Sequence, residues 1–153
     1  MVLATVRPNA WNFPLFLHVG GAMALVASLV MALYTIRIAR ERGDQPAAQF
    51  AFRTLWRFTL PAYIVMRVGA QWIVTKEHLE SSNDTWIGIG FSTSDIGLLL
   101  LLIGMLLTGR MARRAKQGTS VAGAGQLRAA GILAGILVVA YIVTIWAMTT
   151  KPT

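Results

Sequence analysis

The sequence predicts an all-α integral membrane protein, a bundle of four transmembrane helices with its N-terminus and C-terminus both outside. Hydrophobic residues make up 56% of the 153 residues and charged residues only 13%, with a mean hydropathy of +0.60. Soluble domains rarely combine these values. The apolar residues form four runs, and Lys and Arg gather at the ends of the runs. Four spans of about 20 residues would use roughly half of the chain, which predicts a single membrane domain over residues 1–153.

The first predicted helix covers about residues 15–36. Its apolar run follows the segment Trp11–Pro14 and ends at Arg37. A signal peptide has a shorter apolar core and a small-residue cleavage site. We therefore expect this helix to be retained and to span the membrane.

The second predicted helix covers about residues 58–75 and has an interfacial start. Asp44 can cap a helix that Pro46 opens, and a basic stretch with scattered aromatic residues leads from there to the apolar run. We expect this stretch to be helical along the inner interface. Pro61 and Arg67 interrupt the apolar run itself.

The third predicted helix, about residues 88–109, poses a length problem. Its densest apolar part, residues 96–109, has 14 residues and would make about 21 Å of helix, whereas the hydrocarbon core is about 30 Å thick. Either part of the 86–94 segment enters the membrane, or the helix continues inward past Arg110. The fourth predicted helix covers about residues 129–148.

The basic residues predict the orientation and the partners of the chain. Ten Lys and Arg residues lie in the connections expected on one side and three on the other. Positive charge marks cytoplasmic loops, so both termini should lie outside. The net charge of +8 would suggest nucleic acid in a soluble protein. No phosphate-binding loop accompanies it, so we expect the lipid bilayer and no nucleic acid as a partner.

Small residues at regular spacing predict close contacts between helices. Gly20, Ala24, Ser28 and Ala32 follow one another every four residues in the first helix. Gly90, Gly97 and Gly104 recur every seven residues in the third helix. Such spacing lets helix backbones approach closely in a membrane, and it would equally serve self-association.

Arg67 lies near the middle of the second helix and marks a candidate polar site. An arginine at the bilayer centre costs about 2.5–3.5 kcal/mol, so it needs a polar partner. Tyr63 and Gln71 lie four residues to either side of it, on the same helical face. Asp95 is the acid best placed to reach the bilayer and is the expected counter-charge. Alternatively, Asp95 caps the N-terminus of the third helix.

His18 lies about one turn inside the first helix, where its ring should sit near the depth of Gln71 and Asp95. A membrane histidine can bind haem or carry protons, or it can simply hydrogen-bond within the bundle. The other histidine, His78, falls in the polar stretch before the third helix. Two histidines without cysteine do not make a structural zinc site, so no metal site is predicted. Tyr141 could hydrogen-bond into the same polar cluster.

Three segments carry a family resemblance: residues 16–23 (FLHVGGAM), 60–72 (LPAYIVMRVGAQW) and 86–91 (WIGIGF). The first resembles the opening helix of four-helix membrane proteins related to the copper-resistance D family and of the HemJ-like protoporphyrinogen oxidases. The whole pattern, over about residues 11–110, resembles uncharacterised bacterial integral membrane proteins of unknown function. The resemblance implies a bacterial inner membrane and a haem- or redox-linked role for His18. The chain departs from these relatives by lacking their Trp-x-Gly after the histidine and by having Arg67 in place of a lysine.

Three functions are therefore open. The first is a non-enzymatic protein with a polar intramembrane site in its outer half, which binds a small anion, a lipid headgroup or a partner helix. The second is a haem- or redox-linked protein that uses His18. The third is a structural subunit of a larger membrane complex or a homo-oligomer.

The sequence offers little support for an enzyme. No paired carboxylates or nucleophile–base arrangement in the spans points to one, and the absence of cysteine excludes thiol–disulfide chemistry. The candidate site residues are His18, Tyr63, Arg67, Gln71 and Asp95.

Overall fold

A computed structural model describes residues 12–76, 85–121 and 125–150, and these ranges are helical with short connections and no strand. The elements in chain order are α1 (Asn12–Arg42), α2 (Gln45–Thr54), the π-helix η2 (Leu55–Thr59), α3 (Leu60–Lys76), α4 (Thr85–Lys116) and α5 (Gly125–Thr150). Within the described ranges, three helices are long and apolar enough to cross a membrane: Asn12–Arg42, Gly88–Lys116 and Gly125–Ala147. The chain is thus an all-helical protein with membrane-spanning character.

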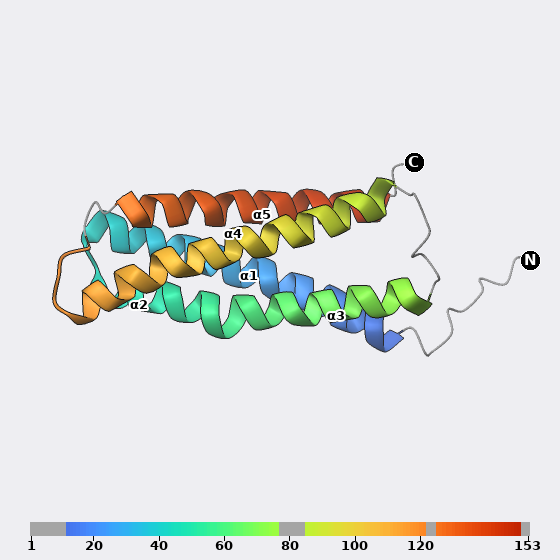
Figure 1. Cartoon of the computed structure of the whole chain (residues 1–153), viewed down its shortest axis with the longest axis horizontal. Helices are drawn as coiled ribbons and strands as arrows, with labels where there is room; N and C mark the ends of the chain where they lie inside the picture. The colour runs from blue at the N-terminus through green and yellow to red at the C-terminus, as the bar shows by residue number, and fades with distance from the viewer. Residues whose placement is uncertain (1–11, 77–84, 122–124, 151–153) are drawn as a thin grey trace, which may run out of the picture.

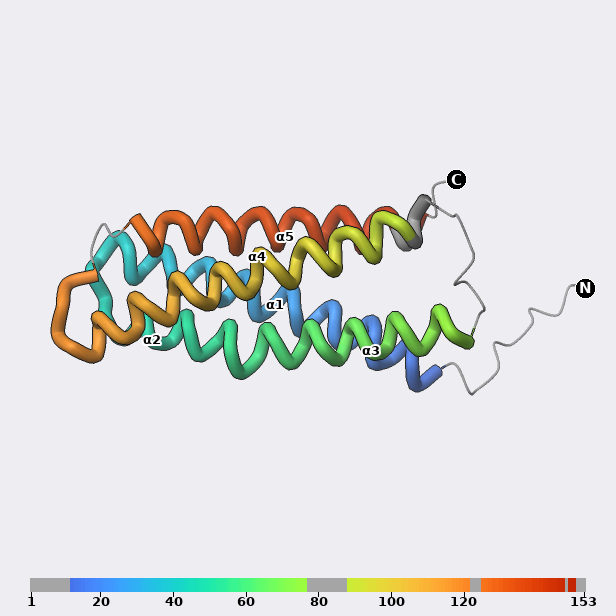
Figure 2. The backbone as a smooth tube through the Cα atoms, viewed as in Figure 1, coloured from blue at the N-terminus to red at the C-terminus, as the bar shows by residue number. Residues whose placement is uncertain are grey.

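The helices run side by side along one long axis (Figures 1 and 2). α1 packs against α3 and α5, and α4 packs against α5, whereas α3 and α4 share few contacts. α2 fills the space between α1 and α4 at one end of the bundle. We call this the basic end, because α1 ends and α5 begins there among most of the Lys and Arg residues. The opposite end, where α1 begins and α5 ends, is the terminal end.

The start of α2 is confirmed as the sequence predicts. Gly43 adopts a φ of 65°, a left-handed conformation that glycine tolerates best. The Asp44 side chain accepts a hydrogen bond from the Ala47 backbone N–H at 3.0 Å, and Pro46 occupies the first turn. Three buried residues on the inner face of α2, two of them alanines, let it pack closely against its neighbours. α2 then leads without a break into η2 and α3, so the interfacial start of the second predicted helix is helical.

The interruption at Pro61 takes the form of the π-helix. A proline ring clashes with the carbonyl group four residues earlier and offers no N–H for the usual hydrogen bond. Directly before Pro61, the Leu60 N–H bonds to the Leu55 carbonyl, five residues back, which is the π-helical pattern. Thr59 is fully buried here, and its hydroxyl donates to the Thr54 carbonyl at 3.3 Å. The wider turn therefore accommodates the proline while keeping the helix continuous.

The predicted boundaries are too short at most helix ends. α1 extends beyond 15–36 at both ends, and α5 extends beyond 129–148. α4 resolves the length problem in both ways at once, since it begins at Thr85 and continues past Arg110 to Lys116. Hydropathy locates only the apolar part of a helix, whereas polar residues beyond the hydrocarbon core still favour helical backbone.

Two clusters of buried side chains hold the bundle together. The larger one includes Leu29 of α1, Met66 of α3, Leu101 of α4 and Leu137 of α5, and therefore joins all four long helices. The smaller one, at the basic end, is rich in alanine and contains residues of α1, α2, α4 and α5.

Candidate functional site

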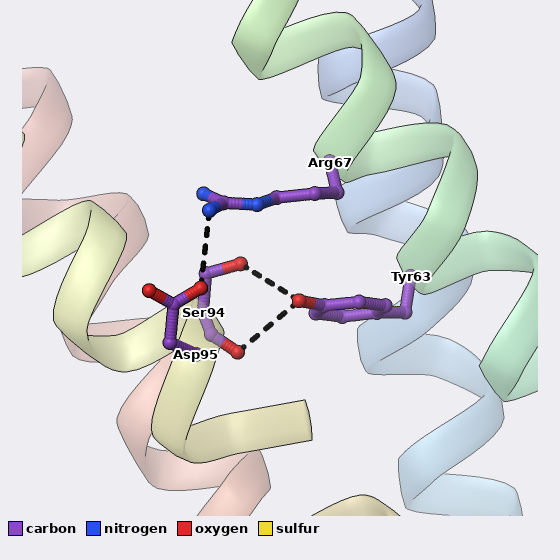
Figure 3. A network of polar contacts seen from close by, with 4 residues as sticks. All are labelled: Tyr63, Arg67, Ser94 and Asp95. Carbon is purple, nitrogen blue, oxygen red and sulfur yellow. Dashed lines mark hydrogen bonds and ion pairs between the residues drawn. The ribbon is translucent and has the colours of Figure 1, made fainter. Parts of the chain in front are cut away.

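Arg67 of α3 and Asp95 of α4 form an ion pair (Figure 3). The guanidinium Nη2 donates to Asp95 Oδ1 at 3.0 Å, so the expected counter-charge is confirmed. The pair is not sealed inside the protein. The Arg67 side chain is 29% exposed and that of Asp95 is 65% exposed. Asp95 lies ten residues into α4, so the interpretation that it caps this helix is wrong, because the helix begins at Thr85.

An aromatic ring supports the same guanidinium. Arg67 Cζ lies 4.6 Å from the centroid of the Phe91 ring, within the range of a cation–π contact. Phe91 precedes Asp95 by one helical turn, so both lie on the face of α4 that is turned toward α3. Arg67 therefore meets a negative charge and a π-face from one neighbouring helix.

A second polar connection lies next to the first. The Tyr63 hydroxyl donates to the Ser94 carbonyl at 3.3 Å and accepts from the Ser94 hydroxyl at the same distance. Both side chains are buried. Figure 3 shows Tyr63 and Arg67 projecting from one helix to the adjacent residues Ser94 and Asp95 of the other. Because α3 and α4 share few other contacts, these polar side chains form a bridge between two helices that hardly pack together. We call Tyr63, Arg67, Phe91, Ser94 and Asp95 the polar bridge.

His18 lies on the opposite flank of α3. Its Nδ1 is 3.1 Å from the Met66 carbonyl oxygen. A carbonyl only accepts hydrogen bonds, so Nδ1 carries the proton. The neutral ring then has its lone pair on Nε2. His18 thus joins α1 to α3, one residue from Arg67 in sequence, but it is not hydrogen-bonded to the polar bridge.

Among the described residues, His18 and Met66 do not fit as the two ligands of a haem between α1 and α3. Gly69 packs so closely on α1 that a Cβ built on it would lie 2.5 Å from the His18 backbone nitrogen. This contact leaves no room for a porphyrin between α1 and α3. The Met66 side chain is buried in the larger core cluster, so it is not free to serve as a second ligand on the surface.

Gln71 does not join the polar bridge. Residues four apart in an α-helix drift by about 40°, so Gln71 is turned by about 80° from Tyr63. Tyr63 is buried whereas Gln71 is exposed, and the structure gives Gln71 no hydrogen bond to the bridge residues. Tyr63 and Arg67 therefore both point toward α4, as the predicted common face requires, whereas Gln71 does not.

Tyr141 of α5 lies nearby, but packs instead of completing the bridge. It is buried in the larger core cluster, and a Cβ built on Gly97 of α4 would lie 2.5 Å from its hydroxyl. His78 lies outside the described residues. Across residues 12–76, 85–121 and 125–150, no three His, Cys, Asp or Glu side chains lie close enough to hold a metal ion.

Two bridge residues, Ser94 and Phe91, are missing from the sequence prediction. Both belong to the segment before the dense apolar run, where the sequence alone does not decide between loop and membrane. Because α4 begins at Thr85, Phe91 lies one turn from Asp95 and Ser94 lies beside it. The predicted helix of residues 88–109 already contains both residues, so their spacing from Asp95 is a signal that the sequence itself offers.

No family model, curated protein or solved structure matches this chain. The resemblance to the copper-resistance D and HemJ-like families therefore stays a prediction. The chemistry of the site has to be inferred from the geometry of the polar bridge alone. That geometry offers a cation and an anion side by side, both partly exposed, and no nucleophile activated by a base among the bridge residues.

Proposed function

We propose that the chain is a four-span integral protein of a bacterial inner membrane. The three long apolar helices supply three spans. The five-residue η2 and the 17-residue α3, which follows it without a break, supply the fourth. Together they make about 30 Å of helix, which matches the hydrocarbon core. Only 28% of the most apolar window of each long helix is buried within the protein. The rest is apolar surface that suits lipid. On the positive-inside rule, the basic end faces the cytoplasm and both termini lie outside.

Within this protein, the proposed function is non-enzymatic binding at the polar bridge. The observation that carries the proposal is the 65% exposure of the Asp95 side chain about 15 Å along α4 from its first residue. At that depth neighbouring lipid chains offer no hydrogen bonds. An exposed charge inside a membrane is costly and commonly functional. A polar group from outside the chain would satisfy it.

The sequence leaves three occupants open: a small anion, a lipid headgroup and a partner helix. A headgroup is favoured, because the bridge is continuous with lipid-facing apolar surface. Ile96 and Leu99, which follow Asp95 along α4, are 60% and 59% exposed. They would contact acyl chains while the headgroup meets the ion pair. If a second membrane protein copurifies with the wild type but not with an Asp95 variant, that result would instead favour the partner helix or the structural-subunit role.

The test compares the wild type with the Arg67→Leu/Asp95→Leu double variant, which removes both charges together. Replacing a whole ion pair by apolar residues is often neutral for stability, so the variant should fold. Thermal unfolding is followed in neutral detergent with and without added bacterial phospholipids. We expect the lipids to raise the Tm of the wild type clearly more than that of the double variant. Equal shifts for both proteins would overturn the proposal.

A haem- or redox-linked role for His18 is the second candidate. One observation favours it: the hydrogen bond from Nδ1 to the Met66 carbonyl leaves Nε2 as the lone-pair nitrogen, the arrangement found in many ligating histidines. A haem would have to bind on the outside of the bundle, away from the close contact between α1 and α3. Protein purified after expression with added haem should then show a Soret band that His18→Ala removes. A spectrum without a Soret band would argue against this role.

A further inference from the structure

The ion pair of the polar bridge is electrically neutral, and this neutrality restricts the ligand. We infer that the polar bridge binds a zwitterion, a molecule that carries an anionic group and a protonated amine a few bonds apart. The inference rests on the proposed function, since it names the ligand class of that same site.

Both charges of the pair are available to a ligand. The hydrogen bond joins Nη2 of Arg67 to Oδ1 of Asp95, so Oδ2 and the other guanidinium N–H groups are not part of it. Both side chains are partly exposed. Arginine is suited to carboxylate and phosphate oxygens because its donors form a planar fork. Asp95 Oδ2 can accept from an ammonium group in the same way.

A lone anion fits this site poorly. Bound to Arg67, it would also face the Asp95 carboxylate, and the complex would carry a net negative charge in a medium of low dielectric constant. No second cation is at hand, since the nearest ones along the same helix, Arg57 and Lys76, lie ten and nine residues from Arg67, about 13–15 Å away along the axis. A cationic ligand would leave a net positive charge for the same reason. A ligand with both charges keeps the complex neutral and pairs each charge with its opposite.

The amine should carry N–H groups. Asp95 is the more exposed partner, and the lipid chains around it supply no donor. A primary ammonium donates hydrogen bonds to a carboxylate, whereas a quaternary ammonium has no N–H to donate. Two sources offer this chemistry: the headgroup of phosphatidylethanolamine, and a free water-soluble zwitterion that enters from the outer side.

Thermal unfolding in neutral detergent distinguishes ligands by charge. The probes are phosphatidylethanolamine, phosphatidylcholine, phosphatidylglycerol and glycerophosphoethanolamine, the last being a water-soluble headgroup. We expect half-maximal stabilisation at a concentration at least about tenfold lower for phosphatidylethanolamine than for phosphatidylglycerol, with phosphatidylcholine also weaker. Stabilisation by glycerophosphoethanolamine would identify a free zwitterion as sufficient, and stabilisation by the lipid alone would identify the membrane as the source. Either result supports the inference.

The Asp95→Asn variant makes the test specific to the site. Without the carboxylate, Arg67 is left unbalanced, and the preference should reverse in favour of phosphatidylglycerol. Glu41→Gln is the matched control, because Glu41 also pairs with an arginine, Arg37 at 2.8 Å, but lies at the basic end. It should retain the wild-type preference.

The failures can be told apart. If phosphatidylglycerol or inorganic phosphate stabilises the wild type as well as phosphatidylethanolamine does, and the Arg67→Leu/Asp95→Leu variant loses that effect, the zwitterion is wrong while the binding site stands. If no probe stabilises the wild type more than the double variant, both the ligand class and the proposed function are wrong.

Discussion

Arg67 is held by contacts of different kinds, and their combination explains how a cation is tolerated in the middle of an apolar helix. Asp95 balances its charge at 3.0 Å, and the Phe91 ring covers one side of the guanidinium. Even so, 29% of the Arg67 side chain is exposed. Both contacts come from α4, although α3 packs mainly against α1. Arg67 therefore needs α4 to compensate its charge, and in return it helps to hold α4 in its position beside α3.

Exchanging the two charges tests this pairing. Arg67→Asp alone and Asp95→Arg alone each place two like charges together between α3 and α4, and each should lower the free energy of unfolding by about 2–4 kcal/mol. The Arg67→Asp/Asp95→Arg double variant restores the attraction and should recover at least half of the loss. Stability is measured by chemical or thermal unfolding in detergent. A double variant that is less stable than both single variants would contradict a direct contact.

The hydrogen bonds between Tyr63 and Ser94 predict that mutating the tyrosine lowers stability more than mutating the serine does. Tyr63→Phe removes a hydroxyl that both donates and accepts, whereas Ser94→Ala removes only one donor. A net hydrogen bond contributes about 0.5–1.5 kcal/mol, so Tyr63→Phe should cost about 1–2 kcal/mol and Ser94→Ala about half of that. Unfolding of both single variants and the double variant gives the coupling. A larger loss for Ser94→Ala would contradict this division of roles.

The sequence predicts part of this site for a clear physical reason. A charge in an apolar run must be compensated, so the pairing of Arg67 with a nearby acid follows from the sequence. Gln71 lies outside the polar bridge, because helical spacing alone does not tell how far around the helix the neighbour reaches, and its part in a binding site stays a prediction. Phe91 and Ser94 escape the prediction although the predicted helix of residues 88–109 contains both, because a phenylalanine and a serine in an apolar segment do not by themselves indicate a polar site.

At the scale of elements, α1 and α3 form the closest helix pair, and a pair of adjacent glycines tests why. A Cβ built on Gly21 would lie 2.5 Å from the Met66 backbone nitrogen, whereas a Cβ on Gly20 would meet nothing within 4 Å. Gly21→Ala should therefore destabilise the protein by about 1–3 kcal/mol. Gly20→Ala should be neutral or stabilise it by up to about 1 kcal/mol, because alanine favours helix. Unfolding in detergent compares the two, and equal effects would contradict the close contact.

These glycines also show the limit of spacing rules. The four-residue series in the first helix predicts contacts at Gly20 and Ala24, but Gly20 is open on its outer side and Ala24 is exposed. Gly21 and Ala32 are buried members of α1. Gly104 has no neighbouring side chain or helix within 4 Å of a built Cβ, whereas Gly97 meets Tyr141. Spacing identifies residues that permit close approach, but the crossing angle and register of the helices decide which ones are used.

At the scale of the whole molecule, packing and polarity are divided between the two ends of the bundle. At the basic end, α2 and the alanine-rich cluster close the space between α1 and α4. Further along, α3 and α4 are connected mainly by the polar bridge. A site placed between helices that hardly pack can exchange a ligand without breaking the core. This arrangement is consistent with binding from the side of the bilayer or from the terminal end.

The membrane topology can be tested without interference, because the chain has no cysteine. Arg42, the last residue of α1, lies exposed at the basic end, and Lys76 is the last residue of α3. If α3 crosses the membrane, these two positions lie on opposite sides. Arg42→Cys should then react with a membrane-impermeant thiol reagent only from the cytoplasmic side, and Lys76→Cys only from the outer side. Inside-out vesicles and intact cells give the two accessibilities.

Labelling of both positions from one side would mean that α3 fails to cross the membrane, which leaves three spans. Arg67 would then need no intramembrane counter-charge. Opposite sidedness would place the polar bridge within the bilayer, where its exposed carboxylate requires a partner.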